Sequence, residues 1–211
     1  VIVGSDVAGA LAAARLAEAG LQVLILEAGK PVERGQAVQN FWNAPIKVPE
    51  CAYPVQPEAI HPTTDRPTDW YQQTGPDLFK STYLKVVGGT TWHWLGTCLR
   101  LLPSDFQTHT LHGYGVDWPI SYADLEPFYL QAEHALGVAG DSAHDLSSPR
   151  SGPFSLPPIP QSFVDRSMDQ ALTGTRFQVR ATPQARNSIV HDARPPCCGS
   201  SRCIPVCPAQ A

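Results

Sequence analysis

The chain has 211 residues, a formal net charge of −4 and a pI near 5.9. Its Lys and Arg residues are scattered, so it lacks the basic patch of a protein that binds nucleic acid or an anionic membrane surface. It also contains no apolar run of about 18 residues and no signal peptide, so no transmembrane helix is expected within these residues.

The first thirty residues predict a β-α-β unit. Residues 1–3 form a short apolar run typical of a buried parallel strand. Residues 8–19 are rich in Ala and Leu, which favour helix, and Gly20 stands where a C-terminal cap is expected. Residues 21–26 predict a second strand, which ends at Glu27. Because the chain starts inside the first strand and without Met, we expect further residues to precede it.

The turn after the first strand has the layout of a dinucleotide-binding fingerprint. VGSDVAG places Gly4 and Gly9 at the first and third glycine positions, and Glu27 follows at the distance expected of the acidic residue that binds ribose. The amides at the helix start can bind a pyrophosphate. Asp6 replaces the middle glycine, and its carboxylate would repel phosphate. A doubly wound sheet that binds no nucleotide is therefore the alternative.

Long loops and a second motif follow. Residues 31–83 carry eight prolines, and this composition predicts long loops with short helical turns. Residues 83–87 (YLKVV) predict a strand that runs into Gly88 and Gly89.

The second half of the chain predicts one clear helix and a connector. We expect Asp124 to cap the helix, Pro127 to lie in its first turn and Gly137 to end it. Its apolar face would consist of Leu125, Phe128, Tyr129, Ala132 and Leu136. Residues 149–160 contain five prolines and predict an extended connector between two lobes.

Four cysteines lie close together near the end of the chain, Cys197, Cys198, Cys203 and Cys207. Their spacing differs from the paired C-x2-C knuckles of zinc ribbons, and a Cys-Pro end is typical of ferredoxin-like iron-sulfur sites. Adjacent cysteines seldom bind one cluster, so three ligands are more natural than four. Disulfide pairing in an oxidising compartment is the alternative.

Several segments together resemble the flavoprotein subunits of membrane-associated gluconate, sorbitol and glucose dehydrogenases, in the glucose-methanol-choline oxidoreductase family. They are VGSDVAGALAAARLAEAGLQVLILEAG, GPDLFKSTYLKVVGGTTWHW, YGVDWPISYADLEPFY, SPRS, QARNS and the cysteine-rich tail. The resemblance covers essentially the entire chain. Members of this family are considerably longer, so it implies an N-terminal fragment whose catalytic His lies beyond these residues.

The resemblance implies an α/β fold, with a Rossmann-like FAD-binding domain that carries long loop insertions (1–148). It also implies the start of a second lobe that carries the substrate and cluster contacts (149–211). The implied cofactor-binding residues are Gly4, Ser5, Gly9, Glu27, Ala28, Gly88, Gly89, Thr90, Thr91 and His93. From the residues alone, GGTT also fits an ordinary turn and His93 a hydrogen-bonded structural residue.

The resemblance further implies a 3Fe-4S cluster on Cys197, Cys203 and Cys207. In this reading, FAD takes a hydride from a hydroxyl-bearing carbon of a sugar, polyol or sugar acid, and electrons pass through the cluster to a cytochrome c subunit. That subunit would feed quinone at the periplasmic face of the bacterial inner membrane, a small companion subunit would aid export, and membrane contact would occur only through the partner. The alternative is a truncated or non-catalytic flavoprotein or electron-transfer module.

Overall fold

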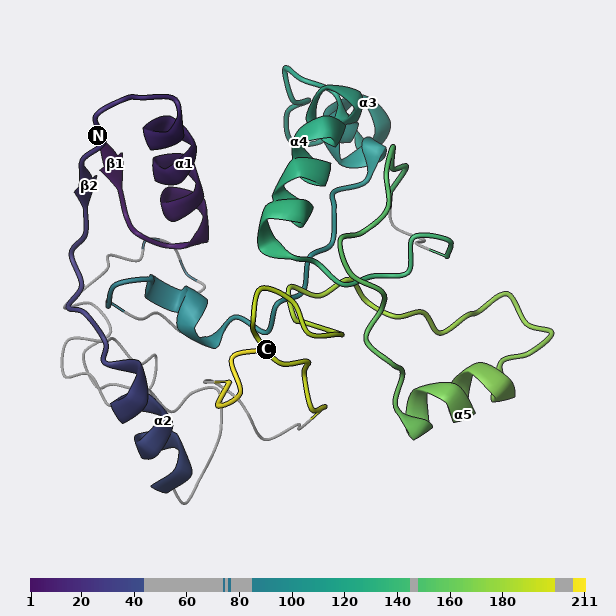
Figure 1. Ribbon diagram of the computed structural model, residues 1–211. Coiled ribbons are helices and arrows are strands. Elements are labelled where there is room, and N and C mark those ends of the chain that lie inside the picture. Colours follow the sequence, from purple (N-terminus) through teal and green to yellow (C-terminus); the bar gives the residue numbers. More distant parts are fainter. Residues whose placement is uncertain (44–73, 75, 77–84, 145–147, 200–206) are drawn as a thin grey trace. The chain divides into compact units, whose positions relative to one another are not determined.

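The computed structural model forms two compact units (Figure 1). Unit 1 consists of Val1–Leu95 with Ser200–Pro208, and unit 2 of Gly96–Gly199 with Ala209–Ala211. The expected domain boundary at residues 148 and 149 stays a prediction. The structure describes residues 1–43, 74, 76, 85–144, 148–199 and 207–211.

Unit 1 opens with the predicted β-α-β unit. Strand β1 (Ile2–Val3) pairs in parallel with β2 (Ile25–Leu26), with Ile2 opposite Ile25 and Val3 opposite Leu26. Helix α1 (Val7–Glu18) connects them. The Rossmann-like α/β class is therefore confirmed, although β2 is shorter than the six residues expected. Only its last two residues form the ladder.

Helix α1 begins one residue earlier than predicted because Asp6 caps it. The Asp6 carboxylate accepts a hydrogen bond from the amide of Gly9 at 2.9 Å, which satisfies one of the amides that a helix start leaves free. The alanines of the sequence favour the helix that follows, and Ala13 is its buried residue.

Two further elements of unit 1 lie in and after the proline-rich region. Helix α2 (Arg34–Asn43) buries Ala37 and Phe41, so it is a longer helix than the short turns expected there. The 3-10 helix η2 (Gly89–His93) follows a single parallel bridge between Lys30 and Val86. The sequence predicts a strand over residues 83–87. Its first two residues lie outside the described part, and the remaining three contain only this bridge.

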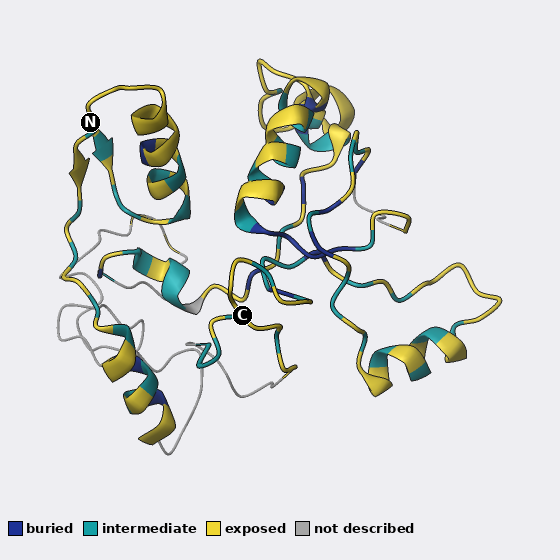
Figure 2. Ribbon diagram, viewed as in Figure 1, coloured by how far each residue is buried: buried dark blue, intermediate teal, exposed yellow. Residues whose placement is uncertain are grey.

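Unit 2 is built mainly from helices, namely η3 (Pro103–Gln107), α3 (Thr108–His112), α4 (Tyr122–Leu136) and α5 (Phe163–Ala171). Figure 2 shows that α5 exposes much of its surface, and none of its residues is buried. Among the described residues, no helix combines the length and apolar character that crossing a membrane requires.

The boundaries of α4 agree with the prediction at one end. Gly137 ends the helix in the left-handed conformation, as expected. The N-cap is Ser121 rather than Asp124, because the two form a reciprocal capping box in which Asp124 is the third helical residue. Pro127 consequently lies in the second turn. Phe128, expected on the apolar face, is 62% exposed.

The core of unit 2 forms where three extended segments meet at Ala139. This residue makes an antiparallel bridge to Gln184 and a parallel bridge to Leu156. Phe154 and Leu156 are both buried. Residues 149–160 therefore pack within unit 2, and their role as a connector between two lobes stays a prediction.

A buried ionic network ties α4 to its neighbours in unit 2. Arg100, 6% exposed, binds Glu133 of α4 through two hydrogen bonds of 2.7 and 2.9 Å. Arg150 reaches the same carboxylate at 2.6 Å. Arg100 also donates to Tyr122 and Glu126, both at 3.0 Å. Each buried charge thus has partners of opposite sign.

Candidate functional site

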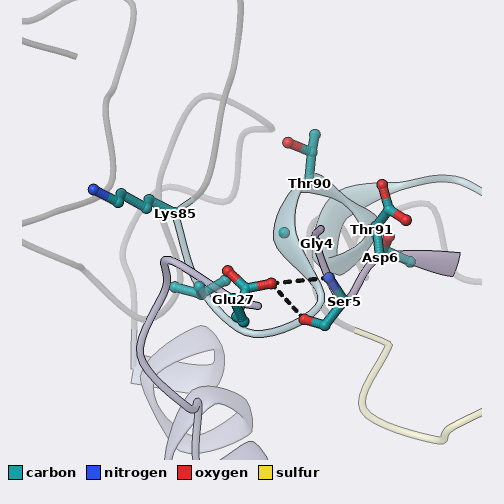
Figure 3. Close-up of a pocket in the computed structure, with 9 residues that line it drawn as sticks. Gly4, Ser5, Asp6, Glu27, Lys85, Thr90 and Thr91 are labelled. Atoms are coloured by element: carbon teal, nitrogen blue, oxygen red, sulfur yellow. Dashed lines mark hydrogen bonds between the residues drawn. The ribbon is translucent and has the colours of Figure 1, made fainter. Parts of the chain in front are cut away.

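Unit 1 contains a pocket of about 270 Å³ at the ends of β1 and β2 (Figure 3). It brings the first glycine turn, the end of β2 and the second glycine motif together, although the two motifs are more than 80 residues apart. The lining residues are Gly4, Ser5, Asp6, Glu27, Lys85, Val86, Gly89, Thr90 and Thr91. Of the predicted cofactor residues, six therefore line one pocket.

Glu27 is held at the pocket wall by hydrogen bonds from the chain itself. Its Oε2 atom accepts from the Ser5 amide at 3.0 Å and from the Ser5 hydroxyl at 2.5 Å, as the dashed lines in Figure 3 show. Its Oε1 atom accepts from the amide of Gly29 at 2.7 Å. The Ser5 hydroxyl above all, and then the Gly29 amide, lower the pKa of Glu27 from its ordinary value. The carboxylate is therefore ionised near neutral pH.

The first glycine turn brings the backbone close to α1. A Cβ atom added at Gly9 would lie 2.2 Å from the carbonyl oxygen of Gly4, so only glycine fits there. This is the close packing that the third glycine of the fingerprint provides.

Asp6 lines the pocket, as expected for a residue in the middle glycine position. The sequence predicts that Asp6 repels phosphate. The structure adds that Asp6 caps α1. Its carboxylate accepts the Gly9 amide, and this is one of the helix-start amides that a dinucleotide-binding turn offers to a pyrophosphate. An anionic ligand would therefore meet an anion already placed at the start of α1.

The second motif contributes Gly89, Thr90 and Thr91 to the pocket wall. Gly88 is joined to the site through its amide, which donates to the Ser5 hydroxyl at 3.0 Å. Ala28 is not among the lining residues, but its amide contributes to the low pKa of Glu27. For His93 the structure describes the backbone at the end of η2, so its contact with the flavin stays a prediction.

Three residues of the site were missed in the sequence. Lys85 and Val86 line the pocket just before the second motif. A Cβ atom at Gly29 would lie 2.3 Å from the Cα atom of Val86, so glycine lets these segments approach. The adjacent Glu-Ala-Gly sequence is the signal that could have indicated Gly29. No local signal marks Val86.

The structure describes three of the four clustered cysteines, Cys197, Cys198 and Cys207, and all three are free thiols. Cys198 is exposed, whereas Cys197 and Cys207 are half-buried. Cys203 lies outside the described residues. Within the described part of the chain, no group of three or more His, Cys, Asp or Glu side chains is arranged to hold a metal ion. The assignment of Cys197, Cys203 and Cys207 as cluster ligands stays a prediction.

Hydrogen bonds to the backbone hold the two described ligand candidates, Cys197 and Cys207. The amide of Cys197 donates to the carbonyl of Asn187 at 2.7 Å. In unit 1, Arg34 donates to the carbonyl of Cys207 at 2.6 Å. Asn187 is 2% exposed and its side-chain amide donates to the carbonyls of His191, Arg194 and Pro195. This amide therefore shapes the turn that leads to the first cysteine.

The pocket residues fit part of a dinucleotide. An ionised carboxylate, a helix start and a glycine loop lie at one pocket, as in dinucleotide-binding turns. The Asp6 carboxylate is the feature that opposes a pyrophosphate. The fit is thus good at the ribose-binding position and weaker at the start of α1.

Comparison with known proteins shows what this chain is similar to. Residues 2–32 match the model of the NAD(P)-binding Rossmann-like domain family. The whole chain is 38% identical over 220 residues to the fructose dehydrogenase large subunit of Gluconobacter japonicus, and covers 40% of that protein.

Two further relatives have related names. The whole chain is 32% identical to the 6'''-hydroxyparomomycin C oxidase of Streptomyces lividus, of which it covers 36%. With 89% of its length, it is 26% identical to the gluconate 2-dehydrogenase flavoprotein of Pantoea cypripedii, covering 35% of it. The chain therefore spans two fifths or less of the length of these relatives. These similarities fit an FAD flavoprotein of the glucose-methanol-choline type.

Proposed function

We propose that this chain is the FAD-binding part of a dehydrogenase that oxidises a hydroxyl group of a sugar, polyol or sugar acid. The observation that carries the proposal is that both glycine motifs and Glu27 line the same pocket. The names of the relatives, fructose dehydrogenase large subunit and gluconate 2-dehydrogenase flavoprotein, support the substrate class.

The residues of the pocket would bind and orient the cofactor. Glu27 is ionised and can accept a hydrogen bond from a ribose hydroxyl. The segment from Gly88 to Thr91 would lie beside the flat ring system, where glycine lets the backbone come close and the threonines Thr90 and Thr91 line the pocket. When bound, FAD supplies the acceptor for the hydride of the alcohol carbon. The base that removes the hydroxyl proton is assigned to no residue of this chain.

We also propose that Cys197, Cys203 and Cys207 bind a 3Fe-4S cluster. The free thiols of Cys197 and Cys207 and the Cys-Pro sequence support this ligand set. Such a cluster would pass single electrons to a cytochrome c subunit at the periplasmic face of the inner membrane, with a small companion subunit in the complex. The name "large subunit" of one relative supports an assembly of several subunits.

The absorption spectrum of the intact subunit that contains this chain tests the proposal. We expect flavin bands that bleach when fructose, gluconate, glucose or sorbitol is added to the intact subunit in the absence of an electron acceptor. A preparation without flavin would refute the proposal. Flavin or iron signals that no alcohol changes would instead favour the non-catalytic electron-transfer module, to which the Asp6 carboxylate in the pocket lends some support.

The cysteine assignment has its own test. We predict that Cys203→Ser abolishes the electron paramagnetic resonance signal of the cluster, because a three-iron cluster loses one of its thiolate ligands. Cys198→Ser is the matched control, since Cys198 is exposed and adjacent to a proposed ligand. Loss of the signal in both variants would make Cys198 a ligand. Retention in both would remove Cys203 from the ligand set.

A further inference from the structure

The hydroxyl of Ser5 joins three segments of the pocket. Its oxygen accepts the amide of Gly88 at 3.0 Å, and it lies 2.5 Å from Glu27 Oε2. Glu27 is ionised and can only accept hydrogen bonds. The direction of both bonds is therefore fixed, with Gly88 donating to Ser5 and Ser5 donating to Glu27.

We propose that Ser5 is a positioning residue that holds Glu27 and the loop starting at Gly88 in the arrangement that receives FAD. This inference rests on the proposed function, which supplies the ligand. An alanine at position 5 would leave the half-buried Gly88 amide without this acceptor and would remove a donor from Glu27. One substitution would thus disturb two motifs that are 83 residues apart.

The backbone N–H of Ser5 cannot replace its hydroxyl. The Ser5 amide already donates to Glu27 Oε2 at 3.0 Å, and it would remain in an alanine variant. The N–H of Ser5 cannot accept the N–H of Gly88, because a backbone N–H is only a donor. The connection between the two motifs through residue 5 therefore depends on the side chain.

Other charged groups lie near Glu27 and could affect how FAD binding depends on pH. Asp6, from the cap of α1, and Lys85, from the segment before the second motif, line the same pocket. Lys30 follows on the segment after β2, where it pairs with Val86. All three are retained in a Ser5 variant. A difference in pH dependence between the wild type and that variant is therefore assigned to Glu27.

Affinity for FAD, measured by quenching of flavin fluorescence on the full chain, is the first test. We expect Ser5→Ala to bind FAD about ten-fold more weakly, as for the loss of a hydrogen bond to a charged group. Ser5→Thr keeps the hydroxyl and should stay within about three-fold of wild type. Ser188→Ala is the control, since it removes a serine hydrogen bond of 2.5 Å, to the Pro157 carbonyl, in unit 2.

The pH profile of FAD binding is the second test, and a merely structural role would not change its midpoint. Wild-type affinity should fall as the pH drops through the lowered pKa of Glu27. In Ser5→Ala this pKa moves back toward 4.5, so the fall begins at higher pH. The contribution of ionised Glu27 to the stability of the fold depends on pH in the same direction as the affinity for FAD. It is present above the unfolded pKa, is lost as the pH falls through the folded pKa, and is smaller in Ser5→Ala.

Wild-type affinity and an unchanged acid midpoint in Ser5→Ala would overturn the inference. If Ser5→Ala does not fold, Ser5→Gly applies the same test, because it removes the same hydroxyl and leaves the backbone unrestricted. A wild-type chain that binds no FAD at all would refute the proposed function instead. The two failures are thus distinguishable.

Discussion

Asp6 shows how one residue can serve the fold and oppose the ligand. At the middle glycine position it brings a negative charge to the pocket, and it also caps α1 through the Gly9 amide. The cap could have been predicted, because Asp directly before a helical sequence is among the preferred N-cap residues. The departure from the glycine pattern therefore has a local structural reason.

The charge of Asp6 can be separated from its capping bond. We predict that Asp6→Asn binds FAD about five-fold more tightly, since it removes a repulsion of about 1 kcal/mol and keeps a capping oxygen. Asp6→Gly should also tighten binding, at a cost of a few tenths of a kcal/mol in stability. Calorimetric titration with FAD and thermal unfolding measure the two effects.

Asp6→Ala is the matched control for the cap. It should lose about 1 kcal/mol of stability, because alanine provides no capping oxygen. Equal affinity for FAD in the wild type, Asp6→Asn and Asp6→Gly would show that the carboxylate does not oppose the pyrophosphate.

Among the helices, α4 and α5 start with the same kind of capping box but differ in how far they are buried. Ser121 with Asp124, and Ser162 with Asp165, form reciprocal capping boxes. Helix α4 buries Tyr122 and Glu133, whereas α5 buries no residue. Both helix starts carry the same Ser-x-x-Asp pattern, and this pattern does not show which helix the core depends on.

This difference predicts different effects of the same substitution. Ser121→Ala should lower the free energy of unfolding of unit 2 by about 1 kcal/mol, because α4 is part of its core. Ser162→Ala should change global unfolding much less and should instead speed amide hydrogen exchange within α5. Denaturant titration and hydrogen exchange measure these quantities. Equal losses of global stability would mean that α5 is as tightly coupled to the core as α4.

At the scale of the molecule, unit 2 is organised around the Glu133 carboxylate. Arg100 and Arg150 both bind it, and they come from segments before and after α4. The SPRS sequence that contains Arg150 contributed to the resemblance, and here it is a structural feature of unit 2. The charges are almost completely buried, with Arg100 and Glu133 exposed by 6% and 5%.

We predict that Glu133→Ala lowers the free energy of unfolding of unit 2 by about 3–5 kcal/mol, because it leaves two buried guanidinium groups without their shared partner. Glu18→Ala is the control. It breaks the surface pair with Arg15, in which the two side chains are 61% and 63% exposed, and should cost about 0–1 kcal/mol. Urea unfolding measures both. A small effect of Glu133→Ala would show that the network adds little to stability.

The sequence by itself determined the β-α-β unit, the glycine turn and Glu27 at the end of the second strand. These features depend on residues that are neighbours in the chain, so periodicity, glycine positions and capping patterns are enough to predict them. The same local reasoning did not indicate that Phe154 and Leu156 are buried, because prolines dominate the pattern of residues 149–160.

Only the tertiary structure decided which distant residues these local features contact. The bond from Gly88 to Ser5, the approach of Gly29 to Val86 and the pairing of Arg100 with Glu133 join residues that are far apart in the chain. A side chain's partner over such distances depends on how the segments pack, which no local pattern specifies. The sequence therefore predicts Glu27 as a cofactor residue, and the structure shows that the amide and hydroxyl of Ser5 both donate to its carboxylate.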